Sequence, residues 1–229
     1  MLSRKICFCS ALSVLLMSSV GSSLFAGGLS KKEKKAGFVA LFNGKDLDGW
    51  MGATKGYVVE SGNLVCLKEG GGNLFTKKTY SDFNFRFEFK LEPRANNGLG
   101  IRAPLEGNPA YDGIELQILD NTAEQYAKLQ PYQYHGSVYG VVPAKRGHLK
   151  PVGEWNSQEV TAVGSRVKVF LNGTTIVDAD IDEASKGGTI DKRDHPGLKR
   201  PKGHFGFLGH GSRIEFRNIR VKNLSKKKK

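Results

Sequence analysis

The side chains best placed for chemistry lie in the polar segment 111–121. Within it, Glu115 and Gln117 are two residues apart. In an extended strand that spacing puts both side chains on one face, about 7 Å apart, while the apolar residues around them point to the other face. Two such polar groups can hold one hydroxyl-rich ring such as a sugar, although a solvent-exposed strand face would show the same pattern.

A second carboxylate, Asp120, follows five residues after Glu115. An odd offset places two strand side chains on opposite faces, and five residues span about 16 Å. The two carboxylates of an ordinary glycosidase lie about 5 to 9.5 Å apart. Acid–base hydrolysis by this pair is therefore disfavoured unless the chain bends sharply, and no other carboxylate pair is evident.

The segment 96–102 reads as a glycine-containing strand that ends in an arginine. Glycine inside a strand often marks the close approach of a ligand or another backbone. The Arg102 guanidinium is a candidate to hold an oxyanion or a carbonyl oxygen. A surface arginine paired with an acid fits the sequence equally well.

Histidines are candidate proton carriers because imidazole titrates near neutral pH. The chain has five, none with H-x-x-x-H spacing, and no C-x-x-C pair, so no zinc site can be read from the sequence. His204 and His210, in a glycine-rich segment, are each either a general base or a structural residue. No cofactor is evident, and a divalent metal held by Glu115 with histidine or aspartate side chains stays open.

The elements that must position these side chains read as β-strands. Segment 83–91 alternates strictly between apolar and polar residues, which is typical of a half-buried strand. Segment 166–178 reads as a hairpin, because its Asn172-Gly173 pair suits a type I′ turn. Further strands are expected at 57–59, 63–67, 98–102, 113–119, 137–141, 155–163, 203–208 and 213–221, with at most short helical pieces at 122–128 and 181–186. This pattern predicts an all-β fold, an antiparallel β-sandwich or jelly roll.

The start of the chain has the pattern of an export signal. Residues 1–26 combine basic residues, an apolar run and Ala26 as a cleavage point; a retained N-terminal anchor is the alternative. We expect a basic linker over 27–36, one domain over 37–225 and a lysine tail over 226–229. The mature protein is then expected to be periplasmic or secreted, with no transmembrane segment.

The charge distribution argues against a nucleic-acid partner. More than half of the formal net charge of +13 lies in the two lysine runs, 31–35 and 226–229. Such runs are usually solvated tails, although they could touch anionic surfaces. Cys66 is the one cysteine outside the first 26 residues and is expected as a buried, inert thiol. Trp155 is expected in the core, with sugar stacking as the alternative.

Several segments, taken in order, resemble the bacterial 3-keto-disaccharide hydrolase domain family. They are 38–50, 97–102, 113–121, 153–156, 171–173, 203–206 with 210–211, and 216–220. The resemblance covers residues 37–224 and implies a concanavalin-like jelly roll that acts on glycosides whose glucose ring carries a 3-keto group. Many relatives have Gln-Asp before the last histidine, where this chain has Leu208-Gly209.

The implied chemistry needs one base and a stabilised oxygen. A ketone at C3 acidifies the proton on C2, a base removes it, and the C1 group departs by elimination, after which water can add. With the strand geometry, the resemblance assigns the enolate oxygen to Arg102 and the base to Glu115 or His210. The expected substrate-binding residues are Asn97, Gln117, Asp120 and Tyr139, with Asp120 also suited to positioning a loop.

Two other functions fit the same sequence, because a fold alone does not fix function. One is a non-catalytic, lectin-like carbohydrate-binding module, and the other is a structural envelope protein with basic arms. The polar cluster around Glu115 favours the enzyme over the structural protein. An enzyme should aim a base into a pocket, whereas a binder should expose aromatic rings on its concave face.

Overall fold

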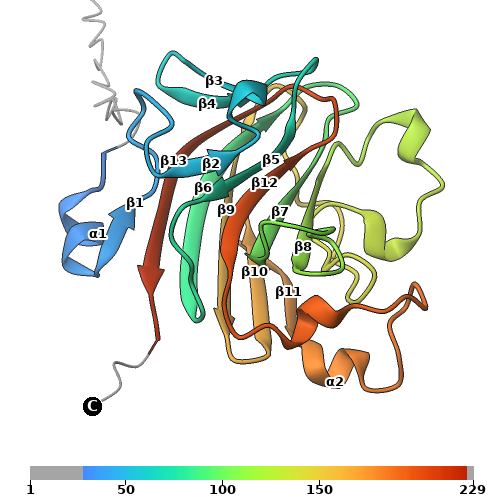
Figure 1. The fold of residues 1–229 in the computed structure, drawn as a ribbon. Helices are drawn as coiled ribbons and strands as arrows, with labels where there is room; N and C mark the ends of the chain where they lie inside the picture. Colours follow the sequence, from blue (N-terminus) through green and yellow to red (C-terminus); the bar gives the residue numbers. More distant parts are fainter. Residues whose placement is uncertain (1–27, 226–229) are drawn as a thin grey trace, which may run out of the picture.

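The chain folds into two antiparallel β-sheets packed face to face, as a computed structural model covering residues 28–225 shows (Figure 1). The expected export signal at 1–26 and the lysine tail at 226–229 lie outside the described residues. The larger sheet has eight strands in the order β11-β10-β9-β6-β13-β4-β3, with β1 paired to β13, and the smaller has five in the order β2-β5-β12-β7-β8. The predicted all-β sandwich is confirmed.

The bounds of the elements are as follows. The eight-stranded sheet contains β1 (Phe38–Ala40), β3 (Tyr57–Glu60), β4 (Asn63–Cys66), β6 (Phe83–Leu91), β9 (Trp155–Val163), β10 (Arg166–Leu171), β11 (Thr174–Asp180) and β13 (Ile214–Asn223). The five-stranded sheet contains β2 (Trp50–Gly52), β5 (Gly72–Thr76), β7 (Asn96–Ala103), β8 (Ile114–Leu119) and β12 (His204–Gly209). Two short helices, α1 (Lys31–Lys35) and α2 (Ile181–Ser185), and four 3-10 turns complete the described part of the chain.

Aromatic rings from both sheets fill the space between them. The apolar face of β6 is fully buried, as its alternation predicts. Phe207 of β12 stacks on Phe216 of β13 with 3.9 Å between ring centroids, and Phe205 lies 4.4 Å from Phe85. Burial of each ring contributes about 1.5–3 kcal/mol, so this layer fixes the five-stranded sheet against the eight-stranded one.

The β10–β11 hairpin turns as predicted at Asn172 and Gly173. Their φ angles are 46° and 91°, the left-handed values that a type I′ turn requires. The expected strand at 137–141 is wrong, because Gly136 and Gly140 take φ values of 83° and 73° and interrupt the extended backbone. Only isolated bridges remain there, from Val138 to Leu116 and Val142.

Part of the expected linker is folded. Residues 31–35 form α1, which begins with a capping box between Ser30 and Glu33. The Glu33 carboxylate also pairs with the Arg220 guanidinium of β13, and this ion pair ties the helix to the outer face of the eight-stranded sheet. Within residues 28–225, no helix has the length and apolar character needed to cross a membrane.

Trp155 lies on the outer face of β9, so its expected place in the core is wrong. The buried set of this strand begins one residue later, at Asn156. The Arg217 guanidinium lies 3.9 Å from the Trp155 ring centroid and the Lys90 amine lies 5.1 Å from it. Cys66 is a buried free thiol, as predicted, and burial raises its pKa.

Candidate active site

An open cavity of about 620 Å³ lies over one end of the five-stranded sheet. Its floor is made by side chains of β5, β7, β8 and the end of β12, and its walls come from loops between the strands. The polar residues that line it are Asn73, Asn96, Asn108, Glu115, Gln117, Gln133, Arg193 and His210, and the aromatic ones are Tyr111, Tyr126 and Tyr139. Four of the residues predicted from the sequence, namely Glu115, Gln117, Tyr139 and His210, therefore meet here.

Glu115 is a nearly buried carboxyl group on the cavity floor. Its side chain is on the face of β8 opposite the core residues Ile114 and Leu116, as the strand periodicity predicts, yet its residue exposure is only 5%. The loops around the cavity cover this face, so all six residues of β8 are buried. Loss of solvent raises the Glu115 pKa to about 7. No described residue donates a hydrogen bond to the carboxylate or pairs with it.

The absence of a side chain at Gly98 makes room for this carboxyl group. Gly98 lies on β7 opposite Gln117, and a Cβ built on it would lie 1.9 Å from Glu115 Oε1. The Glu115 side chain therefore extends across the neighbouring strand instead of pointing straight out of the sheet. Glycine in this strand marks a close approach, but the approaching group is the Glu115 carboxyl and not the ligand or backbone that the sequence suggested.

Gln117 and Asn96 form a polar pair beside Glu115. The Gln117 Nε2 donates a hydrogen bond to Asn96 Oδ1 at 2.8 Å. This bond orients both amides and leaves Gln117 Oε1 and Asn96 Nδ2 without a partner among the described residues. One free acceptor and one free donor suit the hydroxyl groups of a sugar ring.

His210 stands at the rim of the cavity, just after β12. The residue is exposed and is one of those that line the cavity. Partial desolvation lowers its pKa below the ordinary value, so the imidazole is neutral at pH 7 and able to accept a proton. Leu208, which precedes it on β12, supplies an apolar patch of the floor.

A wall of tyrosines faces this floor. The rings of Tyr111 and Tyr139 meet edge to face with centroids 6.5 Å apart. Gln133 Nε2 donates to the Tyr139 hydroxyl at 3.2 Å, and Arg193 Nη1 donates to the Tyr111 hydroxyl at 2.7 Å. Burial, reinforced by Tyr139, raises the Tyr111 pKa despite the arginine, so this phenol remains a neutral donor.

A buried histidine stabilises the loop that carries Arg193. His195 Nε2 lies 3.1 Å from both carboxylate oxygens of Asp191, and its ring lies 4.8 Å from that of Tyr111. Gly140 is needed beside this pair, since a Cβ there would lie 2.5 Å from the Asp191 carboxylate. Arg193 and Tyr111 were not predicted as site residues from the sequence, because the residues of this wall are far apart in the chain and share no local motif.

The structure does not bring Arg102 to the cavity. Arg102 is near the end of β7 remote from Asn96, in a left-handed conformation with φ 49°. Its Nε donates to the Ser81 carbonyl at 3.0 Å, and its Nη2 lies 3.4 Å from Asp82 Oδ1. The buried guanidinium thus ties β7 to the segment before β6, which is a structural role.

Asn97 and Asp120 also lie outside the cavity lining. Asn97 points to the core, where its Oδ1 accepts hydrogen bonds from the Gly98 and Leu208 amides at 2.9 and 3.1 Å. The Asp120 carboxylate accepts from the Arg94 amide and from the amide and hydroxyl of Thr122. Desolvation raises the Asp120 pKa, but these hydrogen bonds outweigh it and the net pKa is lowered. Both residues hold backbone in place.

Two other histidines are structural. His204 Nδ1 lies 2.6 Å from the Thr76 carbonyl oxygen. His135 is buried between the sheets, stacks on Phe89 at 5.0 Å between centroids, and lies 3.0 Å from Gln158 Oε1 through Nε2. Burial lowers the His135 pKa to about 4. In the part of the chain that the structure covers, no three His, Cys, Asp or Glu side chains group as a metal site.

Comparison with known proteins agrees with this geometry. The family model described as a 3-keto-alpha-glucoside-1,2-lyase-like domain matches residues 37–222. The chain belongs to this family. The match includes every residue that lines the cavity.

Three known proteins are similar to this lyase-like domain. A 3-keto-disaccharide hydrolase of Bacteroides thetaiotaomicron is 27% identical, over 82% of this chain and 79% of its own length. A crystal structure of a candidate glycosyl hydrolase from Parabacteroides distasonis is 27% identical and superposes with a TM-score of 0.73, covering 87% of this chain and 100% of that one. The carbohydrate-binding module CBM66 of Bacillus subtilis shares the fold. It is 14% identical, with a TM-score of 0.51, and the match covers 76% of this chain and 96% of that one. The first two, with the family, support a role in carbohydrate processing.

Proposed function

We propose that the protein cleaves glycosides whose glucose ring carries a 3-keto group, with Glu115 as the base. The observation that carries this proposal is the Glu115 carboxyl itself: it is nearly buried, has no partner among the described residues, has a pKa of about 7 and lines an open cavity. A general base works best with a pKa near the working pH. The 3-keto substrate class comes from the family and from the Bacteroides relative.

The reaction proceeds by elimination. The Glu115 carboxylate takes the proton from C2, and the electron pair of that C–H bond moves into the ring, giving an enolate whose charge is on the C3 oxygen. The C3 carbonyl then re-forms, a C1–C2 double bond appears, and the C1–O bond breaks with its electrons on the leaving oxygen. The proton now held by Glu115 is available to that oxygen. Addition of water across the C1–C2 double bond restores the 3-keto sugar.

The Tyr111 hydroxyl is our candidate for stabilising the enolate oxygen. It accepts a hydrogen bond from Arg193, so its own proton is free to point into the cavity. The nearby guanidinium charge stabilises negative charge that develops on the substrate. This pair takes the role that the sequence suggested for Arg102.

The remaining groups bind the ring and the water. Gln117 Oε1 and Asn96 Nδ2 are oriented by their mutual hydrogen bond and are suited to hydroxyl groups of the keto sugar. Neutral His210 at the rim can take a proton from the water that adds at C1. Tyr139, held by Gln133, offers a ring face for the sugar or its leaving group.

The test is release of the leaving group from p-nitrophenyl 3-keto-α-glucoside. Wild-type protein should release nitrophenol well above the buffer rate, and Glu115→Gln should lose about 10²- to 10⁴-fold, the usual contribution of a general base. Glu154→Gln, which changes an exposed carboxylate outside the cavity, is the matched control and should keep full activity. No release by the wild-type protein, together with binding of unmodified glucosides, would instead identify a carbohydrate-binding module.

We also propose that the protein acts outside the cytoplasm, after removal of residues 1–26. The support is the basic, apolar and small-residue order of that segment. N-terminal sequencing of the protein recovered from its native cells should begin at Gly27. A protein that begins at the initiator residue would support the retained-anchor alternative.

A further inference from the structure

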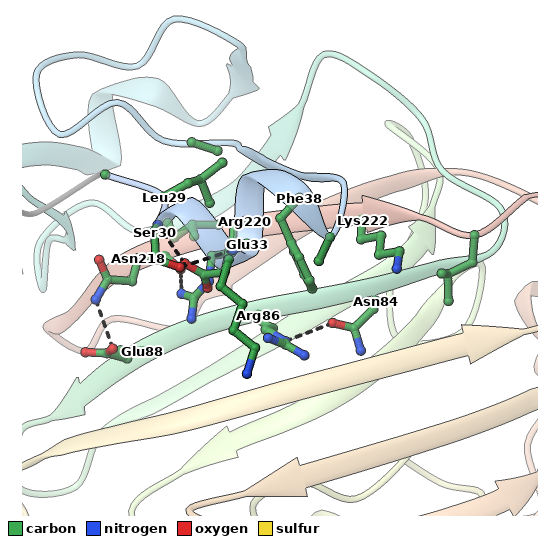
Figure 2. A pocket seen from close by; sticks show the side chains of 16 residues that line it. Leu29, Ser30, Glu33, Phe38, Asn84, Arg86, Glu88, Asn218, Arg220 and Lys222 are labelled. Carbon is green, nitrogen blue, oxygen red and sulfur yellow. Dashed lines mark hydrogen bonds and ion pairs between the residues drawn. The ribbon is translucent and has the colours of Figure 1, made fainter.

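A second cavity, of about 660 Å³, runs under α1 on the outer face of the eight-stranded sheet (Figure 2). Its floor is made by outward-pointing residues of β6 and β13, on the face opposite the phenylalanines that pack against the five-stranded sheet. It shares no lining residue with the cavity around Glu115. In Figure 2 the labelled side chains spread in a row from Leu29 and Asn218 to Lys222, with Phe38 between them. We call this elongated feature the α1 groove.

The carboxylates of the α1 groove are neutralised within the protein. Glu33 pairs with Arg220. Glu88 Oε2 lies 2.7 Å from Arg217 Nε, and Glu88 Oε1 accepts a hydrogen bond from Asn218 at 2.9 Å. Neither carboxylate is left to attract a cation from solution.

The lysines of the groove, by contrast, have no partner. Lys32 of α1 and Lys222 of β13 both line it, and neither amine pairs with a carboxylate among the described residues. Arg86 pairs with Glu159 at 2.7 Å while its guanidinium covers the Phe38 ring at 4.4 Å from the centroid. The free charge that the groove presents is therefore positive, and it comes from one helix and one strand.

We propose that the α1 groove binds a linear anionic carbohydrate, a chain that bears uronate carboxylates. The elongated shape suits an extended chain, and the free lysine amines suit carboxylates. A protein that processes carbohydrate would thereby be held on an acidic polysaccharide through a face that leaves the Glu115 cavity open. This binding does not require the 3-keto chemistry.

The first test is calorimetric titration of the protein with hexagalacturonate and with its fully methyl-esterified form, which has the same rings without the charges. We expect binding of the acid and loss of binding on esterification. Because the contacts are ionic, affinity should fall as salt is raised. Absence of hexagalacturonate binding, or equal binding of the ester, would overturn the proposal.

The second test locates the site. Lys32→Gln/Lys222→Gln should weaken hexagalacturonate binding about tenfold, the effect of losing two solvent-accessible charge contacts. Lys55→Gln/Lys150→Gln removes the same charge from exposed lysines outside the groove and should leave the affinity unchanged. Equal losses in both variants would mean general attraction to a basic protein and would refute the groove. Glu115→Gln should bind as wild type does, so this result and the cleavage assay can fail independently.

Discussion

On the cavity face of the five-stranded sheet, the Glu115 side chain lies in the space that a side chain on Gly98 would need. The carboxyl group of Glu115 occupies the position that a side chain on Gly98 would fill, with Oε1 only 1.9 Å from where the Cβ would be. Neighbouring strands in a sheet are about 4.8 Å apart, so the carboxyl can lie over β7 only because Gly98 has no side chain. The orientation of the proposed base is thus set by a residue that has no chemistry of its own.

Gly98→Ala should therefore reduce activity without unfolding the protein. The added methyl group displaces the Glu115 carboxyl, and misplacing a catalytic group by about 1 Å can cost on the order of 10²-fold in rate. Gly100→Ala is the matched control, because its Cβ would meet Ala103 and Leu208 at ordinary distances of 3.4 Å or more. Steady-state kinetics and thermal unfolding of both variants provide the check, and equal kcat values would contradict the positioning role.

The pH dependence of kcat/KM should show an acid limb near pH 7. Burial raises the Glu115 pKa to about 7, and the base must be ionised to accept the C2 proton, so activity should rise with pH through that value. A limb near the ordinary carboxyl pKa of about 4.3 would mean that the working base is another group or that Glu115 is solvated.

The same pKa predicts a stability effect with a definite sign. Between pH 4.5 and about 7 the folded protein binds the Glu115 proton more tightly than the unfolded chain does, so this group's contribution to stability declines as pH rises through that window. Glu115→Gln should accordingly raise the free energy of unfolding at pH 8, by up to about 3 kcal/mol. Urea denaturation of the two proteins at pH 8 measures the difference, and a less stable variant would contradict the burial argument.

His135 should make the protein sensitive to mild acid. Its pKa is lowered to about 4 by burial, while the unfolded histidine titrates near 6.5, so the unfolded state gains a proton first as pH falls. Stability contributed by neutral His135 is complete above pH 6.5 and is lost progressively toward pH 4, up to about 3 kcal/mol.

Denaturation curves of wild type and His135→Gln at pH 7.5 and pH 5 isolate this effect. The variant should be less stable at pH 7.5, because it loses the stacking on Phe89, but should lose less stability between the two pH values. His148→Gln serves as the control histidine. An unchanged pH dependence in His135→Gln would show that other groups cause the acid sensitivity.

Substitution by glutamine should lower activity at Arg193 but stability at Arg102. Arg193→Gln removes the charge behind the Tyr111 hydroxyl and should lower kcat about 10- to 100-fold with little change in unfolding. Arg102→Gln breaks the buried contacts to Ser81 and Asp82 and should cost about 1–3 kcal/mol of stability while kcat stays near wild type. If Arg102→Gln instead lowers kcat in well-folded protein, Arg102 takes part in the reaction as the family resemblance implies. The assignment of that role to Arg193 and Tyr111 would then be wrong.

The strand patterns show what sequence can predict here. Alternation in 113–119 places Glu115 and Gln117 on one face, and the structure confirms it. Alternation alone does not tell which face of a neighbouring strand is aligned with them. The pairing of Gly98 with Gln117 puts Asn96 on the cavity side and Asn97 in the core, and that register depends on contacts between segments distant in sequence.

The positions of the loop residues that line the cavity could not be predicted from strand patterns. Whether a polar strand face is solvated or covered depends on how loops fold over it, and this decides whether the pKa of Glu115 is ordinary or raised. Arg193 reaches the site through a turn held by Asp191 and His195, with no periodicity to reveal it. Arg102 is on the same strand as Asn96 but lies near the other end of β7, away from the cavity.

The most direct test of the central claim is exchange of the C2 proton in a substrate analogue that cannot be cleaved. In 1,5-anhydro-3-keto-glucitol the C1 leaving group is replaced by hydrogen, so a base can remove the C2 proton but elimination cannot follow. Proton NMR in D₂O should show enzyme-dependent loss of the C2 signal with wild type and Glu154→Gln, and no loss above buffer with Glu115→Gln. Exchange at the wild-type rate in folded Glu115→Gln would contradict the account, because the proton would then be taken by another group.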